Sequence, residues 1–345
     1  MNARPDPVLL RSPDWLLAGF DLDSGQYHFA QVSRQTYHDS TFLDHRIQPM
    51  PTAKTSLDAG QVDEVLKHSQ VAQTAWIFHT GFCCSTLLAT CLDHPATTLV
   101  LREPLVLSRL AHANRSHATQ PVDALNANTQ RVIGLCERSY PAESLLLKPS
   151  NFANRLMDEL FPGSGHQVKR KAILMSSSLE SLLVSILKKK PEAETSLPGF
   201  LRALLQDSDY LQAAGLHTID DLTLLQQSVV FWHCQRYFLQ QRLEQSSAGV
   251  LMPLSMERFL GEPEDVLNEV SGFLGLGLTD EIIRHTIESG AFRRHSKQTD
   301  KAYDPEIHLK EQRATRAMFG QELEATLEWA APLLERLPVE PMDSD

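Results

Sequence analysis

Residues 74–92 read TAWIFHTGFCCSTLLATCL, and this stretch decides the predicted fold. Its first six residues form a short apolar run typical of a buried strand, and residues 85–92 have a helical pattern. Small residues join the two segments. A strand that passes through a short loop into a helix is the first part of a β-α unit, in which helices cover a parallel sheet.

The same alternation continues along the chain. Further apolar runs occur at residues 97–101, 145–147, 172–175 and 250–254, and helical patterns at 58–69, 179–190, 263–274, 278–289 and 308–336. The alternation predicts an α/β fold with a mainly parallel central sheet. A hairpin is predicted over 15–33, and the polar stretch 291–305 is predicted to be a loop.

Three parts of the chain follow from this pattern. We expect an N-terminal extension with the hairpin at 1–70, an α/β domain at 71–305, and a C-terminal helix and tail at 306–345. Residues 191–248 show helical patterns without a strand, so a helical insert is predicted within the α/β domain.

Composition narrows the class of protein. The chain has 345 residues, 42% of them hydrophobic, and a formal net charge of −11, which disfavours nucleic acid and anionic membranes as partners. The five cysteines lack the CxxC spacing of a zinc site. No signal peptide and no apolar run of membrane-spanning length is recognised, so we expect a cytoplasmic protein without a membrane span.

The loop after the first parallel strand contains the residues Thr80, Gly81, Phe82, Cys83 and Cys84, followed by Ser85 and Thr86. Backbone N–H groups at such a strand-to-helix junction can bind an anion, and the two hydroxyls can add hydrogen bonds. The loop is not a Walker A motif, because Thr86 and Leu87 stand where Gly and Lys are needed. The alternative is an ordinary turn with Ser85 as the helix cap.

Several stretches occur in the order found in a known family. They are IFHTGFCCSTLLATCLDHP at 77–95, LREP at 101–104, Lys148-Pro149, ILMSSSLESLLVS at 173–185, residues 249–276 ending in FLGL, and RRHSKQTDKAYD at 293–304. Together they resemble the sulfotransferases, which use 3′-phosphoadenosine-5′-phosphosulfate (PAPS). The resemblance implies a P-loop-type three-layer fold and sulfuryl transfer from PAPS to a hydroxyl or amine of a small-molecule or polymer acceptor, without a metal.

The resemblance also implies site residues. The loop from Thr80 to Thr86 would hold the 5′ side of PAPS. The 3′-phosphate would meet Ser177, Ser185, Arg293, Arg294 and Lys297. Two positions depart from the family pattern: Phe82 stands where most members have Lys or Arg, and Ser177 stands where they have Arg.

Three residues at strand ends are catalytic candidates. Lys148 is costly to bury without an anion and can replace the missing basic residue at position 82. Glu103 can act as general base, or it can be an ion-paired carboxylate. His79 can be a base, a sulfuryl contact or a structural residue. Lysines 188–190 are expected to lie far from the loop.

Other readings of the sequence stay open. The fold can belong to a non-catalytic nucleotide- or protein-binding module, or to an atypical P-loop kinase, which would need a Walker lysine and a magnesium carboxylate. Acceptor recognition is predicted in residues 191–245. There Trp232, His233 and Tyr237 are interpreted as core residues, with a pocket wall as the alternative.

Overall fold

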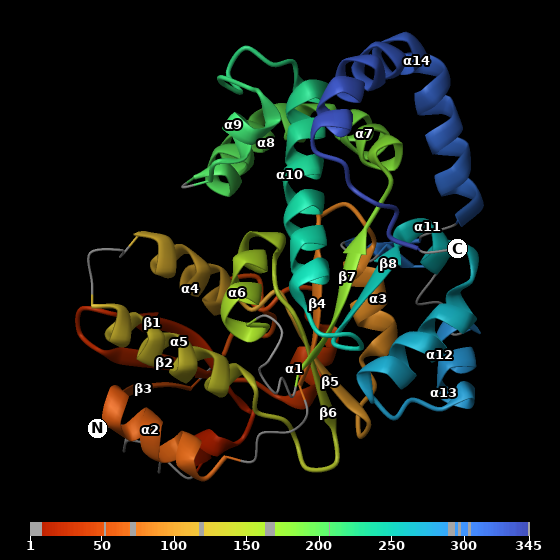
Figure 1. Ribbon diagram of the computed structural model, residues 1–345. Coiled ribbons are helices and arrows are strands. Elements are labelled where there is room, and N and C mark those ends of the chain that lie inside the picture. The colour runs from red at the N-terminus through yellow and green to blue at the C-terminus, as the bar shows by residue number, and fades with distance from the viewer. Residues whose placement is uncertain are drawn as a thin grey trace.

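A central sheet of five parallel strands organises the protein (Figure 1). The computed structural model describes residues 9–51, 53–69, 74–116, 121–162, 170–206, 208–288, 294–295, 298–302 and 305–343. The strands follow the order β5-β6-β4-β7-β8. They are β4 (Thr74–His79), β5 (Thr98–Arg102), β6 (Ser144–Lys148), β7 (Lys171–Ser176) and β8 (Leu251–Ser255). The predicted α/β class with a parallel sheet is confirmed.

Both faces of the sheet are buried, as its unbroken apolar strands predict. Alternate residues of β4 enter different cores: Trp76 and Phe78 face one, and Ala75 and Ile77 face the other. The second core is shared with α3 (Ser85–Leu92), α12 (Pro263–Leu274) and α13 (Asp280–Glu288). The first is shared with α4 (Leu105–Ser116), α5 (Val122–Cys136), the 3-10 helix η2 (Asn151–Leu156), α6 (Met157–Leu160) and the N-terminal segment.

A group of helices lies over the carboxyl ends of the strands, at the top of Figure 1. It contains α7 (Leu179–Lys188), α8 (Lys190–Leu205), α9 (Tyr210–Ala214), α10 (Leu224–Gln245) and α14 (Pro305–Arg336), which kinks at Phe319. These helices share a third core. In the described part of 191–248 the elements are helical, as the sequence predicts. The short α11 (Met256–Gly261) follows β8.

The N-terminal segment forms a small antiparallel sheet of β1 (Trp15–Asp21), β2 (Gln26–Gln31) and β3 (Lys54–Asp58), with α1 (Arg34–Asp39) and α2 (Ala59–Lys67). The predicted hairpin is confirmed. β3 was not predicted, because its sequence KTSLD buries Leu57 alone and carries no apolar alternation.

The expectation of a loop at 291–305 is wrong for the residues described there. Their backbone forms an antiparallel pair of strands, β9 (Arg294–His295) and β10 (Gln298–Ala302). Backbone pairing makes these strands, and a polar sequence gives no hydrophobic signal for such pairing.

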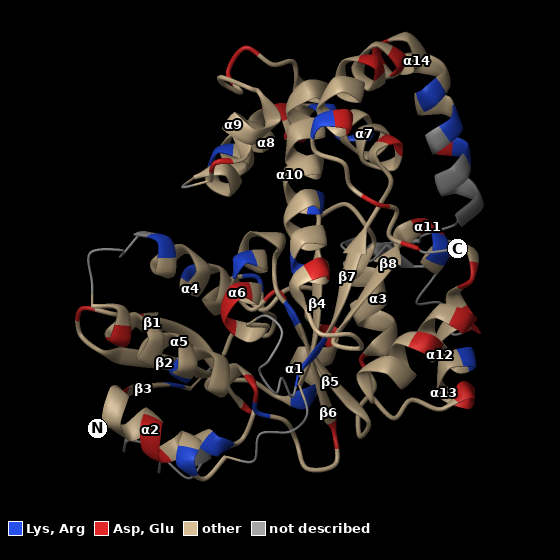
Figure 2. Ribbon diagram, in the orientation of Figure 1, with Lys and Arg blue, Asp and Glu red and all other residues tan. Residues whose placement is uncertain are grey.

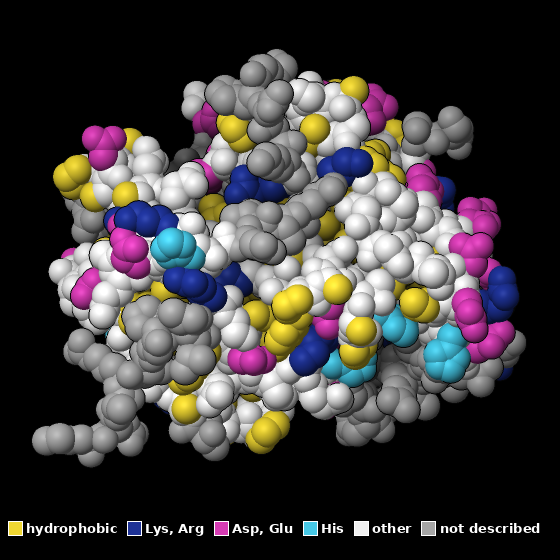
Figure 3. Space-filling view, turned by 90° about the horizontal axis from the view of Figure 1, so that it is seen from below, with side chains coloured by type: hydrophobic (Ala, Val, Ile, Leu, Met, Phe, Trp, Pro, Cys, Tyr) yellow, Lys and Arg dark blue, Asp and Glu magenta, His cyan; other side chains and the backbone are white. Residues whose placement is uncertain are grey.

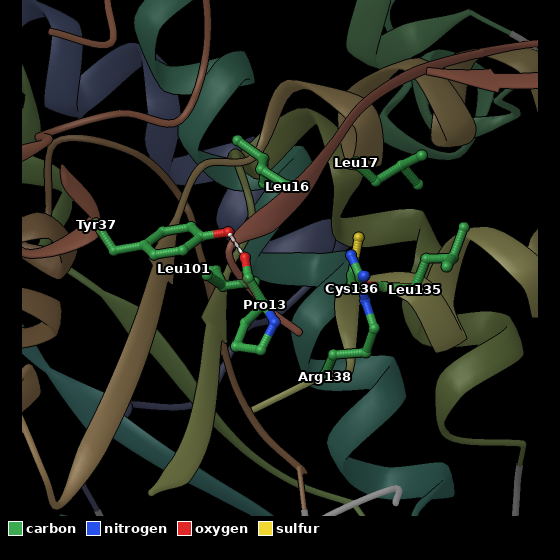
Figure 4. A pocket seen from close by; sticks show the side chains of 8 residues that line it. All are labelled: Pro13, Leu16, Leu17, Tyr37, Leu101, Leu135, Cys136 and Arg138. Carbon is green, nitrogen blue, oxygen red and sulfur yellow. Dashed lines mark hydrogen bonds between the residues drawn. The ribbon is translucent and has the colours of Figure 1, made fainter. Parts of the chain in front are cut away.

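Buried polar side chains attach the N-terminal segment to the α/β domain. The guanidinium of Arg138 donates to the backbone oxygens of Leu10 and Trp15, the latter at 2.6 Å, and Tyr37 donates to the Pro13 oxygen at 2.6 Å. Figure 4 shows Tyr37 and Arg138 around a cavity of about 10 Å³. That volume holds at most about one water molecule, so this cavity is a packing gap and not a ligand site.

A second set of buried charges joins α1 to the sheet. Arg34 contacts Asp93 at 2.8 Å and Glu143 at 2.9 Å, and Arg102 contacts Asp93 at 3.3 Å. Burial alone raises the pKa of Asp93, but the facing His38, Arg102 and Arg34 together hold that pKa below its usual value. Asp93 therefore stays ionised in the core and fixes the extension on β5.

The opposite end of the molecule, seen from below, has acidic and basic side chains next to one another (Figure 3). Among the described helices, not one is both long enough and apolar enough to cross a bilayer.

We predict that Asp93→Asn destabilises the fold by about 3 to 5 kcal/mol at pH 7, because two arginines lose a buried partner. The folded pKa of Asp93 is lowered, so its stabilisation is present at neutral pH and disappears as the pH falls below about 4. Urea unfolding at pH 7 and at lower pH measures the difference.

The matched control is Asp63→Asn. Asp63 pairs with Arg131 at 2.7 Å, but its side chain is 44% exposed, so a loss of at most about 1 kcal/mol is expected. Equal losses for the two variants would contradict the structural role of Asp93.

Candidate functional site

The loop between β4 and α3 has an unusual backbone. Gly81, Phe82 and Cys84 have φ angles of 77°, 51° and 58°, all in the left-handed region. A residue with a Cβ in this region costs about 1 to 3 kcal/mol, and such residues cluster at functional sites. Two of the three are not glycine, so the surrounding structure must hold the loop in this shape.

The loop directs the amino end of α3 toward the carboxyl edge of the sheet. Leu88 donates its N–H to the Cys84 oxygen at 3.0 Å, which is the first hydrogen bond of the helix. The N–H groups that come before Leu88 at the start of a helix have no acceptor within the helix. Such amides and the helix dipole favour a bound anion. Ser85 and Thr86 are both nearly fully buried at this point.

Lys148 and Glu103 form an ion pair beside the loop. Lys148 ends β6 and is fully buried, and its Nζ also lies 3.4 Å from Thr86 Oγ1. Glu103 follows β5 with a left-handed φ of 47°, and its N–H donates to the Lys148 oxygen at 2.6 Å. The structure thus brings together two of the three catalytic candidates and a loop hydroxyl.

His79 braces the loop through both ring nitrogens. The N–H of Gly81 donates to Nδ1 at 3.0 Å, so the ring proton lies on Nε2, which is 3.2 Å from the Pro149 oxygen. The side chain amide of Asn154 donates to the His79 oxygen at 3.0 Å. With both nitrogens engaged, this geometry favours the structural interpretation of His79 over that of a base.

Other loop side chains also brace the turn. Thr80 donates to the Ser176 hydroxyl at 3.2 Å. Cys83 is buried with its Sγ 3.6 Å from the Met175 oxygen, and Cys84 is partly buried. These contacts join the loop to the end of β7. Cys83 acts as a small buried hydrophobe, as the sequence analysis prefers.

The expectation that lysines 188–190 lie far from the loop is wrong for Lys189. Its Nζ lies 5.9 Å from the centre of the Phe82 ring, within cation–π range. The reason is the direction of α7, which rises over the carboxyl edge of the sheet (Figure 1) and does not return along its face. Position 82 lacks a basic residue, but Lys189, which directly follows α7, lies beside it.

The two serines assigned to the 3′-phosphate lie at the end of β7 and in α7. The Ser177 hydroxyl is buried and finds no hydrogen-bond partner among the described residues. The Ser185 hydroxyl donates to the Ser181 oxygen at 2.9 Å. The carboxylate of Glu257 accepts from the Ser178 N–H at 3.1 Å and the Ser181 hydroxyl at 2.7 Å. A carboxylate therefore already occupies the amino end of α7.

The basic residues predicted to close over the nucleotide are not placed. Arg293 and Lys297 lie outside the described residues, and the side chain of Arg294 does too, although its backbone is part of β9. The assignment of these residues to the 3′-phosphate stays a prediction.

A cavity of about 300 Å³ lies next to the loop, between η2 and α6 on one side and the helical insert on the other. Its lining includes Asn151, Asn154 and Arg155, which the sequence analysis missed because polar residues after a strand end carry no distinctive spacing. Tyr237 also lines it, in line with the pocket-wall alternative. Trp232 and His233 are buried, in line with the core interpretation.

Comparisons with known proteins give a structural likeness only. No family model matches the sequence, and no curated protein does. The sulfotransferase domain from the curacin biosynthetic pathway is 14% identical with a TM-score of 0.39, over 62% of this chain and 77% of that chain. A sulfotransferase from Alicyclobacillus acidocaldarius is 12% identical with a TM-score of 0.38, over 77% of this chain and 96% of that chain.

Retinol dehydratase, solved in complex with androsterone and inactive cofactor PAP, is 9% identical with a TM-score of 0.35, over 98% of this chain and 96% of that chain. The first two of these three structures are sulfotransferases. At such identities and TM-scores, function has to be argued from the residues of this chain.

We predict that Glu103→Gln destabilises the fold by about 3 to 5 kcal/mol, because it leaves the fully buried Lys148 without its anion. The double variant Glu103→Gln/Lys148→Met should be closer to the wild type than Glu103→Gln alone. Chemical denaturation of the two single variants and the double variant measures the coupling. Additive losses would mean that the two side chains do not depend on each other.

Proposed function

We propose that the protein is a sulfotransferase that moves a sulfuryl group from PAPS to a hydroxyl or amine. The observation that carries the proposal is the left-handed loop at the start of α3 with the buried Lys148–Glu103 pair beside it. The amides at the start of α3 can bind an anion, and the buried ammonium group of Lys148 lies beside them. This combination suits a reaction in which negative charge moves onto a leaving phosphate. The motif order in the sequence supports the same reading.

The residues present fit a nucleotide with phosphate at both ends. The amides that start α3 and the hydroxyls of Ser85 and Thr86 would hold the 5′ side. The buried Ser177 hydroxyl, without a partner among the described residues, would donate to the 3′-phosphate. Because Glu257 already contacts the start of α7, that phosphate needs positive charge from another part of the chain.

When bound, PAPS would supply the sulfuryl group, whose new bond is to the oxygen or nitrogen of the acceptor and whose broken bond is to an oxygen of the 5′-phosphate. Glu103 would take the acceptor proton. Lys148 would stabilise the charge that builds on the leaving phosphate. Lys189, held beside Phe82, would add positive charge on the solvent side of the loop.

A second candidate is a non-catalytic module that binds the nucleotide without turnover. The observations that favour it are the absence of a basic residue at Phe82 and the engagement of both nitrogens of His79. The two candidates share nucleotide binding and differ in sulfuryl transfer, so rate measurements separate them.

We predict that 3′-phosphoadenosine-5′-phosphate raises the melting temperature more than ATP with magnesium, since the loop lacks a Walker lysine. At a hundredfold excess over Kd a ligand stabilises the fold by about 2.7 kcal/mol. Ser85→Ala/Thr86→Ala should abolish most of this shift. Ser196→Ala, whose hydroxyl donates to the Glu192 oxygen at 2.7 Å on α8, is the matched control. A larger shift with ATP and magnesium would instead indicate a kinase.

We predict that Lys148→Met lowers kcat by about 10² to 10³, with a much smaller change in nucleotide affinity, because the lysine acts where charge develops. Single-turnover transfer to a panel of phenols and amines measures this rate. Lys189→Met should have a smaller effect, because that lysine is exposed. Lys188→Met, which removes a contact to Glu311 at 2.5 Å, is the control. A wild type that binds nucleotide but transfers nothing would support the non-catalytic module.

A further inference from the structure

Two helices begin next to each other at the carboxyl edge of the sheet. α3 follows β4 and α7 follows β7, and these strands are parallel neighbours in which His79 pairs with Met175. The Thr80 hydroxyl donates to the Ser176 hydroxyl at 3.2 Å, so side chains also join the two strand ends. The amino ends of helices favour anions. A ligand with two anionic groups can therefore contact both helices.

The amino end of α7 already holds an anion, the carboxylate of Glu257. Its Oε1 accepts from the Ser178 N–H at 3.1 Å and from the Ser181 hydroxyl at 2.7 Å. Ser178 is the cap residue of α7, so this carboxylate takes the place in which a bound anion would meet the helix. Glu257 lies in the first turn of α11, directly after β8, and β8 is the neighbour of β7. The strand order thus brings this carboxylate to the start of α7.

The basic side chains described around this point are paired with other carboxylates. Arg258, the residue after Glu257, pairs with Glu269. Arg316 of α14 pairs at 2.9 Å with Glu180, which lies in the first turn of α7. Figure 2 shows acidic residues next to α11 and on the last segment of the chain beside it. A phosphate at this end of α7 therefore meets a carboxylate that no described arginine or lysine pairs with.

A buried hydroxyl next to the same point has no partner among the described residues. It is the side chain of Ser177, the residue before the cap of α7, which is 4% exposed. The backbone oxygen of Ser177 is engaged, since it accepts from the Trp232 indole at 2.8 Å. A buried hydroxyl without a partner is unfavourable, so this group is a donor that a ligand can use. The start of α7 thus combines a donor for a phosphate with a carboxylate that opposes it.

We propose that Glu257 is a specificity-determining residue, which competes with the 3′-phosphate of the nucleotide for the amino end of α7. This inference rests on the proposed function, because it concerns the same nucleotide site. Two negative groups cannot share these donors, so the 3′-phosphate has to displace the carboxylate. The hydrogen bonds that the phosphate gains are offset by those that Glu257 loses. The affinity then comes mainly from the 5′ side at α3, and a nucleotide without a 3′-phosphate binds nearly as tightly.

The test is calorimetric titration of 3′-phosphoadenosine-5′-phosphate and adenosine 5′-phosphate into the wild type and Glu257→Gln. In the wild type we expect the two Kd values to differ by less than about tenfold. Glu257→Gln removes the charge and keeps an acceptor oxygen. This variant should bind the 3′-phosphate compound about tenfold to a hundredfold more tightly than the wild type does, as for a hydrogen bond to a charged group. Its affinity for adenosine 5′-phosphate should be unchanged, which also shows that it is folded.

The matched control is Glu262→Gln, which removes the same charge from an exposed residue at the other end of α11 and should leave both affinities unchanged. Three results would overturn the inference while adenosine 5′-phosphate still binds. They are a wild-type preference for the 3′-phosphate compound of about a hundredfold or more, no gain in Glu257→Gln, and an equal gain in both variants. Failure of both nucleotides to bind the wild type would instead overturn the proposed function, and this inference with it.

Discussion

Lys148 ends β6 with its ammonium group fully buried, where an unpaired charge would be strongly unfavourable. Glu103 supplies the counterion, and it does so from the next strand, because Arg102 and Lys148 are register partners in β5 and β6. The left-handed φ of Glu103 turns its carboxylate back over the strand end. This one ion pair thus determines how β5 ends and which groups face the loop at the start of α3.

The helices above the sheet depend on the same edge. α10 crosses over the loop, where the Trp232 indole donates to the Ser177 oxygen at 2.8 Å and Phe231 lies beside Gly81. Gln235 from this helix accepts from Asn151. Because α10 contacts both the loop and η2, the loop and the cavity lie on two sides of one layer of side chains. A change in the position of α10 would alter both.

Much of the fold could be predicted because its central strands are apolar runs between clear turns. β3, β9 and β10 could not be predicted, because their sequences are polar. These strands are defined by backbone hydrogen bonds, which leave no hydrophobic pattern in the sequence. The loop and the strand-end residues Lys148 and Glu103 were recognised from their order, but their pairing depends on which strands are neighbours. The position of Lys189 depends on the direction in which α7 runs. Hydrophobic periodicity along the sequence does not indicate that direction.

Left-handed residues other than glycine are found at five described positions, and three of them surround one point: Phe82, Cys84 and Glu103. Each left-handed residue of this kind costs about 1 to 3 kcal/mol of stability. This loss falls at the carboxyl ends of β4 and β5 and not along the strands. Hydrogen bonds of His79 and Thr80 hold the loop in this conformation. A rigid loop loses little entropy when an anion binds, and its amides need no reorganisation as charge develops. Under the proposed function, the strain and the buried Lys148–Glu103 pair therefore have the same physical consequence, which is a polar site that needs little rearrangement for the transfer of an anionic group.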